Sequence, residues 1–335
     1  MTTIRLALLG CGGIMHKHAG QSQKIAEVQI VGLCDPVRSH MQKLIDRSLT
    51  HLTDPPPMWD DPRNTDEMYR ETGANAVVIA SPHTVHYEQV IGALAGGLHV
   101  LVEKPMVTSL EQAMDVERRV NQSGKVLCIG YNTPCSVEFS TLRQIIRDRS
   151  LGALKVVNAY IAQPWMYATQ NSWRQKPELS GGGMLYDSGA HVFNSIVWAV
   201  EDDVAEVHAY VDNCGSPVDV NGVVNIRFAG GVMAAVAVSG LSRDGSHASF
   251  MFEQGRIDID PWGGAWMEIH RNTGGKVKYP TTVGRDGQPL SNFVDAILGR
   301  DEPRTNARHG VLQSQLMDAV YESARTGQAA KPRVN

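Results

Sequence analysis

Two residues of opposite chemical character lie four positions apart after a run of three glycines. Residues 181–194 read GGGMLYDSGAHVFN and contain Asp187 and His191. Residues at i and i+4 share one face of a helix, and a carboxylate in a first turn is favoured by the helix dipole. Because a histidine exchanges protons near neutral pH, this spacing predicts acid–base chemistry on a helix that carries Asp187 in its first turn. The competing interpretation is an N-capping aspartate and a core histidine.

A second glycine-rich segment, GCGGIM, follows the first apolar run of the chain and precedes a helical pattern. It comes close to the G-x-G-x-x-G pattern, with Met15 in the place of the third glycine. Such a turn lets the backbone approach a pyrophosphate at the N-terminus of a helix. We therefore expect dinucleotide binding by Gly10, Gly12, Gly13 and Ile14, with looser packing at Met15. The alternative is an ordinary turn between a strand and a helix.

An acidic residue, Asp35, ends the second apolar run, 25 positions after Gly10. A carboxylate at this point can accept both ribose hydroxyls of NAD and repels the 2′-phosphate of NADP. Arg38 follows it and could reach a 2′-phosphate from the next helix, which leaves NADP as the alternative cofactor. We favour NAD, with Arg38 as a solvated helix charge, because Asp35 is the stronger constraint.

Polar residues follow the third and fourth apolar runs, where ligands bind in open α/β sheets. They are Ser81, Pro82, His83 and His86 after the third run, and Glu103 and Lys104 after the fourth. A lysine at a buried strand end is costly unless it has a partner or a task, so Lys104 is a candidate proton carrier. The alternatives are a structural Glu103–Lys104 pair and a solvent-facing lysine. No third ligand accompanies the histidine pairs, so the sequence predicts no metal site.

The pattern of apolar runs predicts two domains. Runs at 4–9, 28–34, 76–80, 98–102 and 126–129 are continuously apolar and alternate with helical patterns, as in a doubly wound parallel Rossmann sheet over residues 1–130. Residues 131–335 predict an α+β domain with a large, mainly antiparallel open sheet: helices near 135–149, 290–298 and 308–325, and strands at 153–163 and within 204–280. The Pro- and Asp-rich residues 50–62 read as a surface loop.

Composition narrows the class of protein. The 335 residues carry a net charge of −4, which disfavours a nucleic-acid surface, and no apolar run is long enough to span a membrane. The N-terminus lacks the basic region and the cleavage site of a signal peptide. Five cysteines without C-x-x-C spacing predict reduced thiols in a cytoplasmic protein.

Several segments together resemble the Gfo/Idh/MocA oxidoreductases. They are GCGGIMHKHA, CDP at 34–36, SPHTVHYEQVIGALAGGLHVLVEKPM, GYN at 130–132, WRQKPELSGGGMLYDSGAHVFN and NFVDAILG, and they span nearly the whole chain. The resemblance implies oxidation or reduction of a hydroxyl or ketone, usually on a sugar or cyclic polyol, with NAD(P). This chain departs from the family pattern at Met15, His83 and Asn194.

The resemblance completes the expected site. Trp173 and Arg174 are covered by it as substrate contacts, and Tyr131 and Asn132 follow the fifth strand and could reach the same cleft. The glycines at 181–183 would then let the backbone pass close to cofactor or substrate. In the expected reaction a substrate carbon loses hydride to NAD, Lys104 and His191 handle the hydroxyl proton, and Asp187 orients His191 or holds a neighbouring hydroxyl. Either Lys104 or His191 can be the formal base.

Three functions remain open at this point. The first is a dehydrogenase of a sugar, anhydrosugar or inositol-like polyol, the second an NAD-retaining glycosidase or epimerase, and the third a non-catalytic cofactor-binding regulator. The apolar strands of the second domain, above all VMAAVAVSG, predict a homodimer or homotetramer formed through the open sheet.

Overall fold

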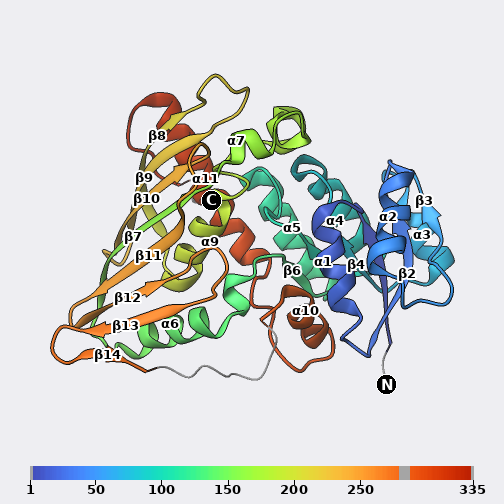
Figure 1. The fold of residues 1–335 in the computed structure, drawn as a ribbon, viewed down its shortest axis with the longest axis horizontal. Helices are drawn as coiled ribbons and strands as arrows, with labels where there is room; N and C mark the ends of the chain where they lie inside the picture. Colours follow the sequence, from blue (N-terminus) through green and yellow to red (C-terminus); the bar gives the residue numbers. More distant parts are fainter. Residues whose placement is uncertain (1–2, 279–286, 333–335) are drawn as a thin grey trace. The chain divides into compact units, whose positions relative to one another are not determined.

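The computed structural model describes residues 3–278 and 287–332, and the chain forms two compact units. The first contains residues 1–130 and 288–310, and the second contains residues 131–287 and 311–335 (Figure 1). The sequence predicted one division, at residue 130. In the structure, residues 288–310 also belong to the first unit. They return because Leu290, Phe293 and Val294 are buried in its hydrophobic core.

The first unit is a six-stranded parallel sheet in the order β3-β2-β1-β4-β5-β6. Helix α1 packs against α2 and α10, and α4 packs against α3 and α5, as in a doubly wound fold. The elements are β1 (Ile4–Leu9), α1 (Gly13–Ser22), β2 (Val28–Cys34), α2 (Arg38–Ser48), β3 (Met58–Trp59), α3 (Thr65–Thr72), β4 (Ala76–Ile79), η1 (His83–Val85), α4 (His86–Ala95), β5 (His99–Val102), α5 (Leu110–Ser123), β6 (Leu127–Ile129) and α10 (Pro289–Ile297).

Local sequence signals account for most of these boundaries. Strand β4 is buried along its whole length, as its continuous apolar run predicts. Helix α5 begins after Ser109, whose hydroxyl accepts from the amide of Gln112, and ends at Gly124 in the left-handed conformation. The predicted loop at 50–62 is interrupted by β3, which pairs with β2 at the edge of the sheet. Met15 is fully buried in the core, and the predicted looser packing of helix on strand at this position stays a prediction.

The second unit is built on an eight-stranded sheet in the order β14-β13-β12-β11-β7-β10-β9-β8. All its neighbouring pairs are antiparallel except β7 and β10, so the predicted fold class is confirmed. The elements are η2 (Thr133–Cys135), α6 (Val137–Asp148), β7 (Leu154–Ala162), α7 (Trp165–Ala168), η3 (Trp173–Gln175), α8 (Pro177–Ser180), α9 (Gly189–Val200), β8 (Val204–Asp212), β9 (Asn221–Phe228), β10 (Met233–Ser239), β11 (Gly245–Phe252), β12 (Gly255–Ile259), β13 (Met267–Arg271), β14 (Gly275–Val277) and α11 (Ala307–Thr326). Residues 279 and 280 of the predicted strand region lie outside the described residues.

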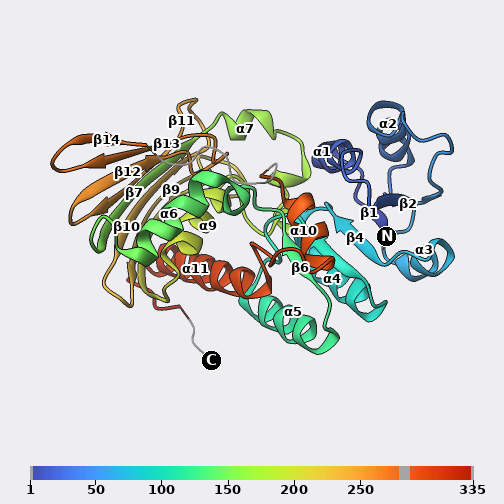
Figure 2. The ribbon, with the colours of Figure 1, turned by 90° about the horizontal axis from the view of Figure 1, so that it is seen from below.

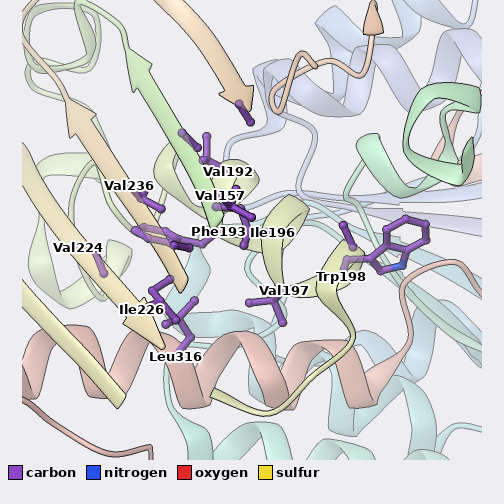
Figure 3. Packing of buried hydrophobic residues seen from close by; sticks show 14 of the residues in the cluster. Val157, Val192, Phe193, Ile196, Val197, Trp198, Val224, Ile226, Val236 and Leu316 are labelled. Atoms are coloured by element: carbon purple, nitrogen blue, oxygen red, sulfur yellow. The ribbon is translucent and has the colours of Figure 1, made fainter. Parts of the chain in front are cut away.

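One face of this sheet carries the core of the second unit. Helices α6, α9 and α11 lie along it (Figure 2). Helix α9 is buried on all sides except at its last residue, and Phe193, Ile196 and Val197 pack with side chains of the sheet and with Leu316 (Figure 3). This buried helix also carries His191, so the core holds that residue in place.

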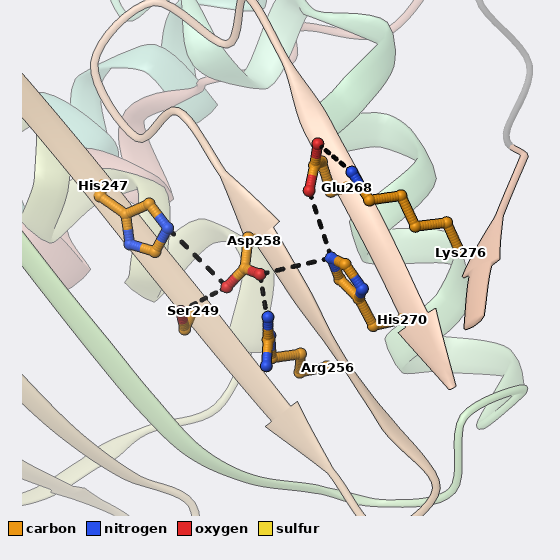
Figure 4. A network of polar contacts seen from close by, with 7 residues as sticks. All are labelled: His247, Ser249, Arg256, Asp258, Glu268, His270 and Lys276. Carbon is orange, nitrogen blue, oxygen red and sulfur yellow. Dashed lines mark hydrogen bonds and ion pairs between the residues drawn. The ribbon is translucent and has the colours of Figure 1, made fainter. Parts of the chain in front are cut away.

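The opposite face of the sheet is exposed. Strand β9 alternates between buried and exposed residues, as expected of a sheet with one solvated face. The exposed side includes Tyr210, Val223, Met233, Met251 and Trp266. A polar network covers this face on strands β11 to β14 (Figure 4). In it, Asp258 contacts His247, Ser249, Arg256 and His270. Glu268 contacts His270 and Lys276. Burial alone raises the pKa of Asp258, but hydrogen bonds from Ser249 and Arg256 outweigh it and hold that pKa below its usual value.

Candidate active site

The glycine-rich turn after β1 has the geometry of a phosphate-binding loop. Gly10 has φ +84°, and a Cβ there would lie 2.7 Å from the carbonyl carbon of Ala80, so only glycine fits. A Cβ at Gly12 or Gly13 would meet nothing within 4 Å. Helix α1 has no side-chain cap and no acid in its first turn, and the side chain of Ile14 is exposed. This arrangement suits a bound pyrophosphate.

Asp35 is fixed at the end of β2 by three donors. Its Oδ2 accepts from the amide of Cys11 at 2.7 Å, and its Oδ1 accepts from the amide of Val37 at 2.8 Å and from His40 Nδ1 at 3.2 Å. Because a carboxylate has about four acceptor positions, the three donors leave about one position for a ribose hydroxyl. Arg38, the first residue of α2, has an exposed side chain. The cluster therefore fits the sugar of a dinucleotide.

His86 is fully buried and joins the two loops that follow β4 and β5. Its Nδ1 lies 2.8 Å from the carbonyl oxygen of Pro105, and its Nε2 lies 2.9 Å from that of Ser81. Burial lowers the pKa of His86 against the opposing effect of these carbonyls. The imidazole was predicted to contact the cofactor, but with no exposed surface it is better suited to holding Ser81 and Pro82 next to the Lys104 loop.

Hydrogen bonds within the first unit also hold the carboxylate of Glu103. One oxygen lies 2.8 Å from Nε2 of His18, the other accepts from the amide of Lys104 at 3.3 Å, and both side chains of the His18–Glu103 pair are buried. A Cβ at Gly130 would lie 2.7 Å from this carboxylate. Lys104 itself is partly exposed. Since the strands are parallel, Gly10, Asp35, Ser81 and Lys104 all follow strand ends at the same edge of the first sheet.

In the second unit, helix α9 begins at Gly189, with Ser188 as its N-cap. Asp187 therefore precedes the helix, and its predicted position in the first turn is wrong. Its Oδ2 accepts from Trp165 Nε1 at 2.7 Å and from Arg174 Nε at 2.9 Å, and the guanidinium of Arg174 stacks on Trp173 at 4.5 Å. Asp187, Trp173 and Arg174 are thus brought together, with Trp165 as an anchor.

His191 lies between two aromatic rings. Tyr131 meets it edge-on, with ring centroids 5.7 Å apart, and Trp262 lies 4.3 Å from it at an interplanar angle of 53°. Asn132 donates its side-chain amide to the carbonyl oxygen of Trp262 at 3.1 Å, and its predicted contact with substrate stays a prediction. Trp262 was not among the predicted site residues. It lies in the sequence DPWGG, which is typical of a turn.

The three glycines before Asp187 have a packing role. A Cβ at Gly183 would lie 1.9 Å from the backbone oxygen of Asp219, and one at Gly182 would lie 2.6 Å from the hydroxyl of Tyr321. The buried Asp219 carboxylate accepts from the amides of Gly183 and Leu185 and from Tyr321. These close approaches are to the protein itself, and the predicted approach of the glycines to cofactor or substrate stays a prediction.

Among the described residues, no cluster of three or more His, Cys, Asp or Glu side chains is arranged to hold a metal ion. Within the same residues, no helix combines the length and the apolar character that crossing a bilayer requires.

A dinucleotide-type Rossmann unit followed by a second α/β unit with a buried Asp and His defines a class of NAD(P)-dependent oxidoreductases. Residues 4–131 match the family model described as an oxidoreductase family with an NAD-binding Rossmann fold, and residues 139–258 match the GFO/IDH/MocA C-terminal domain. The chain belongs to the Gfo/Idh/MocA family, so the predicted resemblance is confirmed.

Similar proteins cover the whole chain. D-glucoside 3-dehydrogenase of Escherichia coli is 25% identical, with 97% of this chain and 96% of the relative covered. Inositol 2-dehydrogenase of Arthrobacter is 22% identical, with 99% and 97% covered. Among solved structures, an aldose–aldose oxidoreductase from Caulobacter crescentus superposes with a TM-score of 0.84 at 19% identity, covering 98% of this chain and 99% of that one. At this low identity, the similarity to the solved structure supports the fold of this chain and nothing further.

Proposed function

We propose that the protein transfers a hydride between NAD and a hydroxyl-bearing carbon of a sugar, an anhydrosugar or an inositol-like polyol. The observation that carries this proposal is full-length similarity to the glucoside and inositol dehydrogenases. A 1,5-anhydro-D-fructose reductase from Ensifer adhaerens, 26% identical over 80% of this chain and 83% of its own length, adds the anhydrosugar class. The NAD-retaining glycosidase or epimerase and the non-catalytic regulator are not favoured by these relatives.

NAD supplies the hydride acceptor of the oxidation. The turn at Gly10, Gly12 and Gly13 would hold its pyrophosphate, and Asp35 would hold the adenosine ribose. Asp35 favours NAD, although a similar D-xylose 1-dehydrogenase from Haloarcula marismortui, 22% identical over 75% of this chain, is named for NADP. The cofactor preference is therefore the part of the proposal that most needs measurement.

Side chains of this protein would accept the proton of the substrate hydroxyl. When hydride leaves the substrate carbon, the C–O bond becomes a carbonyl, and the hydroxyl proton passes to a basic nitrogen of Lys104 or His191. Where His191 takes the proton, the ammonium group of Lys104 stabilises the developing negative charge on oxygen. Asp187, tied to Trp165 and Arg174, fixes the substrate-side loop, and Trp173 offers an aromatic surface for the sugar. One proton and one hydride leave the substrate, so the reaction balances.

A substrate panel tests this function. Sugars, inositols and anhydrosugars are incubated with NAD and followed by NADH absorbance and by product analysis. One NADH per molecule of ketone supports a dehydrogenase. Turnover without net NADH supports the redox-recycling class, and cofactor binding without any turnover supports the regulator.

We also propose a cytoplasmic homo-oligomer. None of the five cysteines, which all lie in the described part of the chain, forms a disulfide bond, and Cys11, Cys34 and Cys128 are buried, which suits a reducing compartment. A second copy is the proposed occupant of the open sheet face. That face combines exposed apolar residues with a network in which Asp258 and Glu268 are matched by Arg256 and Lys276, so it can complement itself across a twofold axis.

A further inference from the structure

The turn that follows β12 is organised by one carboxylate. Asp260 accepts from the amides of Trp262, Gly263 and Ala265 at 3.0, 3.1 and 3.3 Å. It also accepts from the hydroxyl of Ser246 on β11 at 2.9 Å. Four donors on one side chain fix the backbone of residues 260–265, which we call the Trp262 turn.

Two further segments of the second unit hold the same turn. The amide of Asn132 donates to the carbonyl oxygen of Trp262 at 3.1 Å, and the hydroxyl of Ser195 donates to that of Pro261 at 2.9 Å. Ser195 also meets Thr133 at 2.9 Å. The carbonyls of a solvent-facing turn can be satisfied by water, so bonds from separate segments indicate that the position of this turn matters.

These bonds place an indole against the candidate proton carrier. Ser195 lies four residues after His191 on α9, so one helical face bears both the histidine and the donor that holds the Trp262 turn. The rings of Trp262 and His191 are 4.3 Å apart. Tyr131 and His191 are buried, whereas Trp262 is partly exposed. Trp262 is thus the ring of this group with the most surface left to offer a ligand.

We propose that Trp262 is a substrate-contacting residue that sets specificity for a cyclic substrate. A pyranose or cyclitol has a face of C–H groups that packs on an aromatic ring, and an indole beside His191 would receive that face next to the reacting hydroxyl. The Trp262 turn keeps the indole at a fixed distance from His191. This inference rests on the proposed function, because it takes His191 as a proton carrier of the reaction.

The chain supplies a matched control. Trp266 lies four residues further on and also packs beside a histidine, with its ring 5.7 Å from that of His247 on the exposed sheet face. Its side chain is more exposed than that of Trp262. Loss of Trp266 removes a similar volume and a similar Trp–His contact on the face proposed for assembly, to which no substrate contact is assigned, so the oligomeric state of this variant is measured beside its kinetics.

The experiment compares Trp262→Leu, Trp262→Phe and Trp266→Leu with the wild-type protein. Each is assayed with the best compound of the substrate panel, and binding of that compound to the protein with NADH bound is measured by calorimetry. For Trp262→Leu we expect a rise in KM and Kd for the sugar of about five- to tenfold, the size of one aromatic contact. Trp262→Phe should recover part of it. NADH affinity should be unchanged, and Trp266→Leu should keep the wild-type KM and Kd for the sugar when both are compared at the same oligomeric state.

A second variant separates the indole from its support. Asp260→Asn keeps Trp262 but replaces one acceptor oxygen of the turn by a donor, so it should raise KM while preserving thermal stability better than removal of the indole does. The inference is overturned if Trp262→Leu and Trp266→Leu give the same KM and Kd. If the wild type binds a panel compound without oxidising it, the proposed function fails, whereas loss of that binding in Trp262→Leu still supports the inference. If no panel compound binds, both are overturned.

Discussion

At the scale of single residues, the contacts of Asp187 define its task. Its carboxylate precedes α9 and accepts from Trp165 and Arg174, which come from two other short segments. Hydrogen bonds that involve a charged group are among the stronger ones in proteins, so Asp187 can fix both side chains. His191, inside the helix, is held by the core and by Tyr131 and Trp262. The two residues therefore have different supports.

The first prediction concerns the proton carriers. Replacing either Lys104 or His191 by alanine should lower kcat by roughly 10²–10⁴, the usual range for general acid–base catalysis. The double variant should be much less than multiplicatively worse, because residues that act as a unit are not additive. Kinetics are measured together with Tm and NAD affinity. A destabilised His191→Ala enzyme with normal kcat would make His191 a core residue only.

The second prediction concerns the cofactor. Since Asp35 is fixed by Cys11 and Val37, its charge should exclude a 2′-phosphate, and kcat/KM should favour NAD over NADP by at least about tenfold, or about 1.4 kcal/mol. Arg38, which is exposed, is the residue that could instead favour NADP, so its replacement tests the role of Asp35. Arg38→Ala should leave the NAD preference in place, whereas equal or reversed preference in the wild type would mean that Arg38 prevails.

At the scale of elements, backbone packing decides which glycines are required. Gly183 belongs to the loop before α9, where a Cβ would collide with the backbone of Asp219. Gly20, in α1, has nothing within 4 Å of its Cβ position. The two glycines thus have opposite consequences for stability, although neither is distinguishable from the other by composition.

The third prediction uses this pair. Gly183→Ala should destabilise the protein by at least about 2–3 kcal/mol, because the backbone of Asp219 has no flexible end that could move aside. Gly20→Ala should stabilise it by about 0.4–1 kcal/mol, because alanine restricts the unfolded chain and fits the helix. Thermal unfolding of both variants measures the difference. A Gly183→Ala protein as stable as Gly20→Ala would contradict the close approach.

At the scale of the whole molecule, the exposed sheet face is the proposed site of assembly. A monomer would leave Tyr210, Val223, Met233, Met251 and Trp266 in water. Several exposed apolar residues on one face of a sheet make that face a candidate interaction site.

The fourth prediction is therefore a dimer or tetramer at micromolar concentration, measured by light scattering. Val223→Lys on β9 should weaken the assembly, because it brings like charges together across a twofold axis. Lys125→Glu, a change of charge in the first unit, provides the control and should leave the assembly unchanged. A wild-type monomer at that concentration would contradict the role of the open sheet.

The sequence alone determined the fold class, the family and the nucleotide loop, because these depend on local patterns. Buried parallel strands read as continuous apolar runs, and Gly10 and Asp35 stand at fixed places relative to them. The start of α9 was misplaced by a few residues, because Asp187 and Ser188 are both good capping residues and the choice between them depends on tertiary contacts.

Only the tertiary structure decided the partners of the individual side chains. Asp219 lies 36 positions from Gly183 along the chain, and Asn132 lies 130 positions from Trp262, so no local spacing could pair them. In the same way, α10 returns to the first unit because its apolar side chains complete that core. Contacts between distant segments are set by packing of the whole sheet and its helices, and that packing brought Trp262 to His191.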